Sequence, residues 1–330
     1  MTAVITGKPR KVTPAGVLVA RADAPREEWL ALRRQGIGGS DALAVLGLDP
    51  WKTRMEVFLD KTGALPEREQ SGRMRWGQIA EAPIAEWFTE RTGIRTRRCG
   101  LLRHQDRHWQ RVSVDRLTAD GGVLEIKNTN YHRRAEWEDD LGETVADGAE
   151  AQAQHALAVT GLSHAWVCAQ VGGEPPVIRR VERDEAFIAD LVTIEAQFWE
   201  LVRNSTPPAL EGGEAAAKLI ARLYPDVVPG KTVELTAAQY DLLREYRKES
   251  AAAKAAGDRK EEIKAVITSV MGDAETALYE GKPAATWGHR NRTQVPKDNV
   301  AILREKHPAA AAEVIETTSY RQFSVKKEAA

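Results

Sequence analysis

The sequence predicts an α/β fold in which a central mixed sheet is flanked by helices, followed by a smaller C-terminal extension. Helical patterns fill most of residues 26–93, strand patterns follow over 96–127, and another helix then precedes two more strands. A stretch rich in Pro and Gly, 204–215, marks a boundary. We therefore expect a first domain over residues 1–210 and an extension over 211–330.

The composition is that of a soluble globular protein. The 330 residues are 42% apolar and 29% charged, with a net charge of −1. No run approaches the roughly 18 apolar residues that a membrane span needs, and the N-terminus lacks an apolar stretch of signal-peptide length. Cys99 and Cys168 are too few for a disulfide framework or a four-thiolate metal cluster. These features indicate a cytoplasmic protein without a membrane partner.

The first helices are indicated by amphipathic spacing and by residues that favour helix ends. Residues 26–35 have the spacing of an amphipathic helix, and Gly38-Gly39 then interrupts it. Ser40 suits the N-cap of a second helix running to Leu46. A third helix ends at Gly63.

A fourth helix, closed by Gly93, carries an acid on its apolar stripe. Glu81 lies three and seven residues before Ile84 and Phe88. A buried acid is costly unless it has a partner, so Glu81 is expected to contact either a metal cation or the side chain of an arginine.

The rest of the first domain alternates strands and helices. Strands at 96–103, 109–115 and 122–127 predict an antiparallel meander, followed by a polar helical stretch at about 131–141. The later pattern predicts a helix over 148–161, strands over 164–171 and 176–183, and a helix over about 184–203.

The extension is predicted to be a helical hairpin with short strands. Thr236 and Gln239 form a capping box at the head of a helix that runs to about Ala256. A second helix, about 258–271, ends at Gly272. Short strand patterns follow in 275–290 and 319–327.

The hairpin "VDRLTADGGVLEIKN", residues 114–128, concentrates chemically suggestive residues. Glu125 and Lys127 are two positions apart on a strand, so they share a face. If Asp115 converges with Glu125 across the hairpin, the two carboxylates make a hard oxygen site suited to Mg²⁺ or Mn²⁺. The alternative is an exposed ion pair between acid and lysine.

Residues 91–111 carry seven arginines and one acid, Asp106. This density indicates either a solvated basic face or a track that faces phosphates, because the planar guanidinium suits phosphate oxygens.

Four motifs, read in order, resemble the phage λ-type exonucleases, also called YqaJ-type viral recombinases, of the PD-(D/E)XK nuclease superfamily. They are "LRRQGIGGSDALAVLG", "RWGQIAE", "SVDRLTADGGVLEIK" and "AQAQHALAVTG". The resemblance implies a core like that of restriction endonucleases, formed by the central mixed sheet and its helices. The chain departs from the family pattern at Arg116, because the family usually has a glycine directly after the hairpin aspartate.

The resemblance implies a set of site residues. The metal ligands match Glu81, Asp115, Glu125 and the carbonyl of Ile126, and the catalytic lysine matches Lys127. The glutamine that positions the attacking water matches Gln152, with Gln154 as a competitor.

The "GIGGS" segment has two interpretations. Its glycines and the following helix start favour phosphate binding, and the resemblance implies that Arg33 and Ser40 hold the 5′-phosphate of the DNA strand. The alternative is a plain connection between two helices.

The resemblance further implies that the protein is a Mg²⁺-dependent exonuclease, with two ions per site and Mn²⁺ as a substitute. Such an enzyme digests one strand of linear double-stranded DNA from the 5′ end. The 3′ overhang serves phage-type recombination in a bacterial host, with a homotrimeric nuclease and a single-strand annealing protein as partner. Two alternatives remain: an endonuclease of the same superfamily, and a DNA-binding protein with a decayed nuclease site.

Overall fold

The computed structural model describes residues 10–66, 71–138, 144–291, 297–316 and 321–325. The chain forms two compact units, Met1–Tyr224 and Pro225–Ala330. Helix α7 (Glu214–Leu223) buries Ala216 and Leu219 and belongs to the first unit, so this unit extends past the Pro- and Gly-rich stretch.

The helices that open the first unit follow the predicted pattern closely. They are α1 (Arg26–Arg34), α2 (Gly39–Val45), α3 (Arg54–Lys61) and α4 (Gly72–Thr92), which ends at Gly93 and contains Pro83. The predicted N-cap at Ser40 is wrong. Gly38 precedes α2, and the Asp41 carboxylate accepts its backbone N–H at 3.0 Å, which frees the Ser40 hydroxyl for another partner.

The main sheet has five strands in the order β3-β6-β7-β8-β9. Their bounds are β3 (Thr96–Arg97), β6 (Arg116–Thr118), β7 (Val123–Thr129), β8 (His164–Val171) and β9 (Val177–Glu182). Strands β7 and β8 are parallel, and the other pairs are antiparallel. Helix α5 (Asp147–Thr160) makes the crossover that parallel neighbours require. The predicted mixed sheet flanked by helices is confirmed.

The predicted meander is wrong, because β4 (Leu101–His104) and β5 (Arg111–Ser113) belong to a second sheet. Its order is β1-β2-β4-β5, with β1 (Arg10–Lys11) and β2 (Gly16–Ala20) from the N-terminal part of the chain. Leu101 and Leu102 of β4 are both buried, so this strand has two covered faces. Local alternation cannot reveal a partner strand that lies about eighty residues earlier in the sequence.

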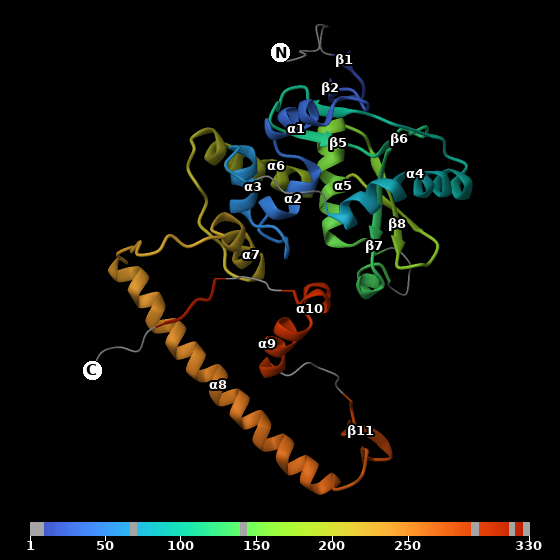
Figure 1. The fold of residues 1–330 in the computed structure, drawn as a ribbon. Helices are drawn as coiled ribbons and strands as arrows, with labels where there is room; N and C mark the ends of the chain where they lie inside the picture. The colour runs from blue at the N-terminus through green and yellow to red at the C-terminus, as the bar shows by residue number, and fades with distance from the viewer. Residues whose placement is uncertain (1–9, 67–70, 139–143, 292–296, 317–320, 326–330) are drawn as a thin grey trace. The chain divides into compact units, whose positions relative to one another are not determined.

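Helices cover both faces of the main sheet (Figure 1). Val123 of β7 and Val167 of β8 pack in the core cluster that includes α5. Leu124 and Cys168, one position along each strand, pack against Ile84 and Phe88 of α4. The alternation of strand side chains therefore points successive β7 residues toward α5 and toward α4.

The remaining elements of the first unit are η1 (Tyr131–Glu136), a 3₁₀-helix, and α6 (Glu185–Arg203). The polar helical stretch expected at 131–141 is thus a 3₁₀-helix over its first part, and residues 139–143 lie outside the described residues. Helix α6 packs on α5, α2 and α3. No helix in the described part of the chain has both the length and the apolar character of a membrane span.

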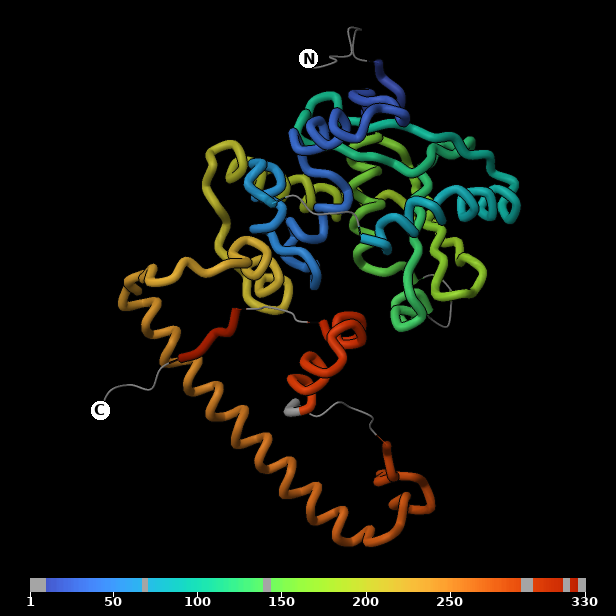
Figure 2. The backbone as a smooth tube through the Cα atoms, in the orientation of Figure 1, coloured from blue at the N-terminus to red at the C-terminus, as the bar shows by residue number. Residues whose placement is uncertain are grey.

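The second unit contains one long helix where a hairpin was predicted. Helix α8 runs unbroken from Ala237 to Met271 through Gly257 (Figure 2). The capping box at Thr236 and Gln239 and the end at Gly272 are confirmed. Gly257 weakens a helix but does not reverse the chain, so the prediction of a turn there is wrong.

Short elements complete this unit. They are β10 (Thr276–Tyr279), β11 (Lys282–Thr286), α9 (Lys297–Lys306) and α10 (Pro308–Val314). The first predicted strand region is confirmed as the β10–β11 hairpin. The second, 319–327, is not a strand over 321–325, and its other residues lie outside the described ones.

Candidate active site

Three polar side chains meet on the face of β7 that α5 covers. The Lys127 ammonium donates to Glu125 Oε1 at 2.7 Å and to Gln152 Oε1 at 2.7 Å. The Gln152 amide in turn donates to Glu125 Oε1 at 2.6 Å. Glu125 is only 6% exposed, so these contacts provide the partners that a buried carboxylate needs. Strand alternation and the crossover helix together form this triangle.

Asp115 lies in the short link between β5 and β6, beside β7. Its Oδ2 accepts the backbone N–H of Ile126 at 2.7 Å. Burial and the nearby charge of Glu125 raise the pKa of Asp115 well above its usual range, and the charge of Glu81 adds to the rise. The Ile126 hydrogen bond and the Lys127 charge oppose it. The charged form of the Asp115 carboxyl group is therefore disfavoured by burial and by repulsion from Glu125 and Glu81.

Glu81 of α4 contacts an arginine. Arg116 of β6 makes an ion pair with Glu81 and donates to the Asp115 carbonyl oxygen at 2.6 Å. This pairing is the alternative that the sequence left open for Glu81. Arg116 itself stands where the resembling family usually has glycine, so its guanidinium is a feature of this chain's site.

Hard oxygen donors are present, although they do not form a ready coordination shell. No group of three His, Cys, Asp or Glu side chains among the described residues has the arrangement of a metal site. Burial is the main cause that raises the pKa of Asp115, and the charges of Glu125 and Glu81 add to it, so both acids lie close enough to act on Asp115. Carboxylates that repel one another in a partly buried site are suited to a hard divalent cation. The donor set fits such an ion once Glu81 is released from Arg116.

The structure distinguishes the two candidate glutamines. Gln152 contacts Lys127 and Glu125, as described above. Gln154 is buried elsewhere, donating to the Glu182 carbonyl oxygen at 2.8 Å and accepting the Asp184 N–H at 3.1 Å. Gln154 therefore ties α5 to the segment between β9 and α6, and only Gln152 reaches the lysine.

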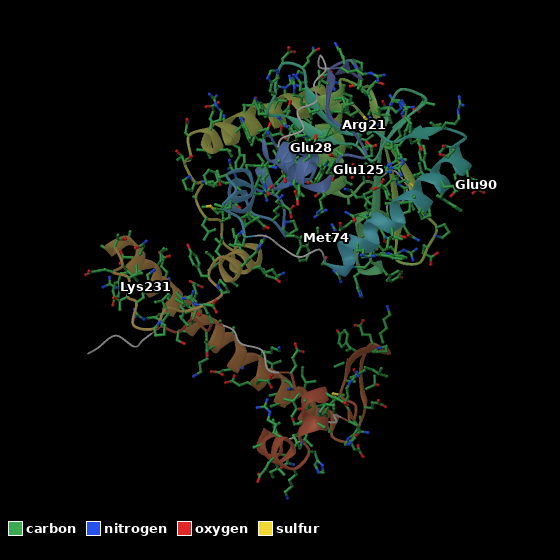
Figure 3. All side chains as sticks on the ribbon, turned by 45° about the horizontal axis from the view of Figure 1, so that its top comes forward. Arg21, Glu28, Met74, Glu90, Glu125 and Lys231 are labelled. Carbon is green, nitrogen blue, oxygen red and sulfur yellow. The ribbon has the colours of Figure 1, made fainter. Side chains whose placement is uncertain are left out.

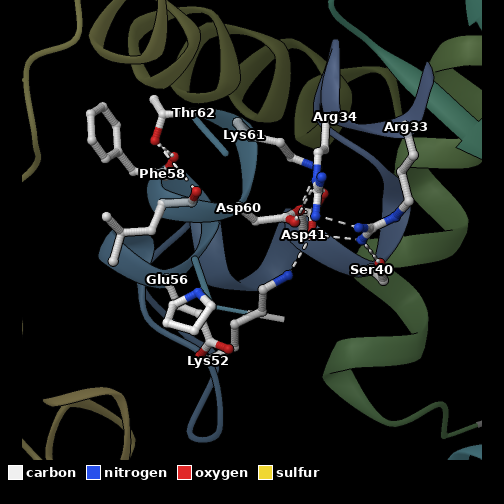
Figure 4. A network of polar contacts seen from close by, with 12 residues as sticks. Arg33, Arg34, Ser40, Asp41, Lys52, Glu56, Phe58, Asp60, Lys61 and Thr62 are labelled. Atoms are coloured by element: carbon white, nitrogen blue, oxygen red, sulfur yellow. Dashed lines mark hydrogen bonds and ion pairs between the residues drawn. The ribbon is translucent and has the colours of Figure 1, made fainter. Parts of the chain in front are cut away.

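Arg33 and Ser40 also meet, in a cluster of charges drawn in Figure 4. Arg33 Nη2 donates to Ser40 Oγ at 3.0 Å and to Asp41 Oδ1 at 3.1 Å. Its Nη1 donates to Asp60 Oδ2 at 3.2 Å. Further cations contact the same two acids, so that four cations face two carboxylates; we call this set the cationic cluster: Arg33, Arg34, Lys52, Lys61, Asp41 and Asp60.

Asp41 organises the cationic cluster, and sequence analysis missed it. Its side chain is fully buried, with Lys52 Nζ at 2.5 Å and Lys61 Nζ at 2.6 Å. Burial raises the pKa of Asp41, but the charges of Lys52, Lys61 and Arg33 outweigh burial and hold that pKa well below its usual range. The available signal was an acid directly after Ser40; nothing local announced Lys61 as its partner.

One cavity joins the two groups of residues. It measures about 670 Å³, and its lining includes Ser40, Lys127 and Gln152, with Leu48 and Trp51 also contributing. The cavity is therefore bordered by the Ser40 hydroxyl, which Arg33 contacts, and by the paired side chains of Lys127 and Gln152. Figure 3 marks Glu125 within the first unit.

The glycines of "GIGGS" serve close packing. A Cβ atom at Gly39 would lie 2.9 Å from Gln152 Cγ, and one at Gly36 would lie 2.4 Å from the Trp109 carbonyl oxygen. Because side chains are excluded at both positions, α2 can approach α5 at the residue that contacts Lys127.

Comparison with known proteins gives three kinds of match. The model of the YqaJ-like viral recombinase domain matches residues 28–163. In backbone structure, the chain is similar to the alkaline exonuclease LHK-Exo from Laribacter hongkongensis, with 20% identity, a TM-score of 0.44, and coverage of 55% of this chain and 94% of that one.

Two relatives match in sequence. Protein D345L of African swine fever virus (strain Badajoz 1971 Vero-adapted) is 31% identical over 78 residues, which are 22% of this chain and 23% of that protein. Protein YqaJ of Bacillus subtilis (strain 168) is 33% identical over 321 residues, which are 95% of this chain and 98% of that protein. The chain therefore belongs to the family of YqaJ-like viral recombinases.

Proposed function

We propose that the protein is a metal-dependent exonuclease that degrades one strand of linear double-stranded DNA from the 5′ end and leaves a 3′ overhang. The observation that carries this proposal is the contact of Lys127 with Glu125 and Gln152, beside the buried Asp115. A lysine held by an acid next to mutually repelling carboxylates suits phosphodiester hydrolysis. Membership of a viral recombinase family is consistent with a DNA substrate.

We call Glu81, Asp115 and Glu125 the acidic cluster, and each of these acids and its neighbours has a role in this proposal. Glu81, Asp115, Glu125 and the Ile126 carbonyl would hold Mg²⁺, or Mn²⁺ in its place, as two ions per site, and the bound ions would supply polarisation of the scissile phosphate. Lys127, as the neutral amine, would accept the proton of the attacking water and become the ammonium, and Gln152 keeps the Lys127 side chain in place through their 2.7 Å contact.

The 5′ polarity rests on the cationic cluster. Four cations against two carboxylates leave an excess of positive charge beside Ser40, and Ser40 lines the same cavity as Lys127. Arg33 and Ser40 hold the 5′-terminal phosphate there, because a guanidinium and a hydroxyl both donate to phosphate oxygens. Arg33 and Ser40 would thereby select the 5′ end of the strand that enters the cavity.

Release of acid-soluble nucleotides from linear duplex tests the activity and its polarity. With Mg²⁺, the protein is expected to digest 5′-phosphorylated ends faster than unphosphorylated ends, and Ser40→Ala is expected to reduce that preference. Ser250→Ala, an exposed serine of α8, is the control. Cleavage of closed circular DNA would identify an endonuclease instead. Inactivity in both Mg²⁺ and Mn²⁺ would indicate a decayed site.

The biological setting follows from the proposed overhang. A 3′ overhang is the substrate of a single-strand annealing protein, which we take as the partner in phage-type recombination. A homotrimeric ring around DNA explains processive digestion, since threaded DNA cannot readily diffuse away. The protein acts in the cytoplasm of a bacterial host.

A further inference from the structure

A second hollow of the first unit, the basic groove, is lined by six cations from four segments. It consists of two adjoining depressions of about 480 and 330 Å³ that share Arg21, Ala22, Arg98, Cys99 and Gly100. The cations along the two depressions are Arg10, Lys11, Arg21, Arg26, Arg97 and Arg98. Figure 3 marks Arg21 on the first unit.

The positive charge of the basic groove is largely uncompensated. Its one acid, Asp23, is 3.1 Å from Arg21 Nε, and both side chains of this pair are exposed. Within the described part of the chain, the other five cations make no ion pair. Five cations without an acidic partner along one hollow can neutralise the phosphates of a polyanion, which then releases the cations condensed on it.

The arginine-rich segment 91–111 supplies part of this charge, and five of its seven arginines fall into two groups. Arg103, Arg107 and Arg111 are spent inside the protein, each donating to backbone carbonyl oxygens. Arg97 and Arg98 are exposed in the basic groove. Whether the segment is a solvated basic face or a track that faces phosphates therefore depends on what Arg97 and Arg98 contact in the basic groove.

The groove begins beside the acidic cluster. Its lining includes Gln78, one helical turn before Glu81, and Ser113, two residues before Asp115. Trp29 Nε1 donates to Ser113 Oγ at 3.0 Å at that end of the groove. The groove shares no lining residue with the cavity that holds Lys127 and Gln152. It therefore leads from the acids by a route separate from that cavity.

We propose that the basic groove binds the sugar–phosphate backbone of a DNA strand that extends from the acidic cluster. The proposal rests on the proposed function for the identity of the polyanion, and it adds a binding site for the part of the DNA beyond the reacting end. Arginines suit successive phosphates because each presents several donors in a fixed plane. Such contacts position a strand without reading its sequence.

The test is DNA binding as a function of salt, in metal-free buffer so that cleavage does not interfere. The variant is Arg97→Gln with Arg98→Gln, and the charge-matched control is Arg180→Gln with Arg203→Gln, two arginines outside the groove. Fluorescence anisotropy follows single-stranded oligonucleotides and duplexes with single-stranded tails, over about 50 to 200 mM salt. Thermal unfolding of each variant verifies that it folds.

Loss of two phosphate contacts is expected to reduce the slope of log K against log salt. The reduction is about 1.4 for a single strand and about 1.8 for a duplex, so the two magnitudes tell which form occupies the groove. Either reduction, absent in the control, supports the proposal. A slope equal to the parent's overturns it, even if the parent digests DNA. Conversely, a parent that binds through the groove but releases no nucleotides contradicts the proposed function alone.

Discussion

At the scale of single residues, the chemistry of the acidic cluster and of the adjoining Lys127 depends on which charged group each side chain contacts. Lys127 is 2.7 Å from Glu125 Oε1 and from Gln152 Oε1, and Glu81 faces Arg116. Asp115 faces other acids, and its pKa is raised by burial and by Glu125. The site therefore combines one positioned ammonium group with carboxyl groups that need a cation, and each can be changed separately.

Lys127→Ala is expected to lower the rate of nucleotide release by about 10²–10⁴-fold, the range for removing a group that transfers a proton in the transition state. DNA binding should be largely retained, because Ser40 and the cationic cluster are untouched. Initial rates and anisotropy on the same duplex measure both quantities, with Lys231→Ala, an exposed lysine of the second unit, as control. Digestion by the variant at the parent's rate would remove Lys127 from the mechanism.

Arg116→Gln is expected to tighten binding of Mn²⁺. The ion pair with Glu81 competes with a cation for the same carboxylate, and partly exposed ion pairs are worth about 0.2–1 kcal/mol. The dissociation constant should therefore fall by up to roughly fivefold. Isothermal titration calorimetry measures it directly, and Glu81→Gln should shift it in the opposite direction. Weaker binding by Arg116→Gln would mean that the arginine supports the ion rather than competing with it.

At the scale of elements, α5 links the site to the core. Three residues after Gln152 on this helix, His155 is buried, with Nδ1 2.6 Å from Glu195 Oε1 of α6 and Nε2 2.8 Å from the Arg111 carbonyl oxygen. A carbonyl oxygen only accepts, so Nε2 carries a proton, and when Nδ1 is also protonated its N–H donates to Glu195 Oε1. The pair fixes the helix that presents Gln152 to Lys127.

His155→Asn is expected to alter how stability depends on pH. Burial lowers the pKa of His155, but Glu195 and the Arg111 carbonyl, with a contribution from Asp41, outweigh burial and raise that pKa above its ordinary value of 6.5. The folded state thus holds the proton more tightly, and stability is lost as pH rises through the folded pKa. The parent's melting temperature should fall over that range.

In the variant, this fall should be absent, and the free energy of unfolding at pH 6 should be lower by about 3–5 kcal/mol, as for breaking a buried pair. Melting curves recorded from pH 6 to pH 9 in one buffer system compare the two proteins. Parallel curves would show that His155 does not carry a linked proton.

At the scale of the whole molecule, the protein combines an α/β unit with a second unit built on α8. The match to protein YqaJ of Bacillus subtilis covers 95% of this chain, so both units have counterparts in that relative. The acidic cluster, the cationic cluster and the basic groove all lie in the first unit. The proposed ring is the property that concerns the molecule as a whole.

Light scattering of the purified protein is expected to give three times the 36.4 kDa of one chain. Digestion of a long duplex should then be processive, because a closed ring retains its DNA, and adding excess competitor duplex after the start should leave the ongoing reaction unchanged. A monomeric mass, or immediate arrest by competitor, would contradict the ring.

Local signals in the sequence determined most elements and one face of the site. Period and capping placed α1, α4, α5 and α6, and strand alternation put Glu125 and Lys127 on one side of β7. Such signals act within a few residues, so they survive any tertiary arrangement. For the same reason they erred where an outcome depends on distant partners, as in the predicted meander and in the reversal expected at Gly257.

The sequence by itself determined which side chains this protein has for cation and phosphate chemistry, because residue type and order fix donors and local faces. Tertiary structure alone decided which of them meet. It chose Gln152 over Gln154 for Lys127, turned Glu81 to Arg116, and surrounded Asp41 with three cations. Coulomb energy and burial depend on distance through space, and separation along the chain does not encode that distance.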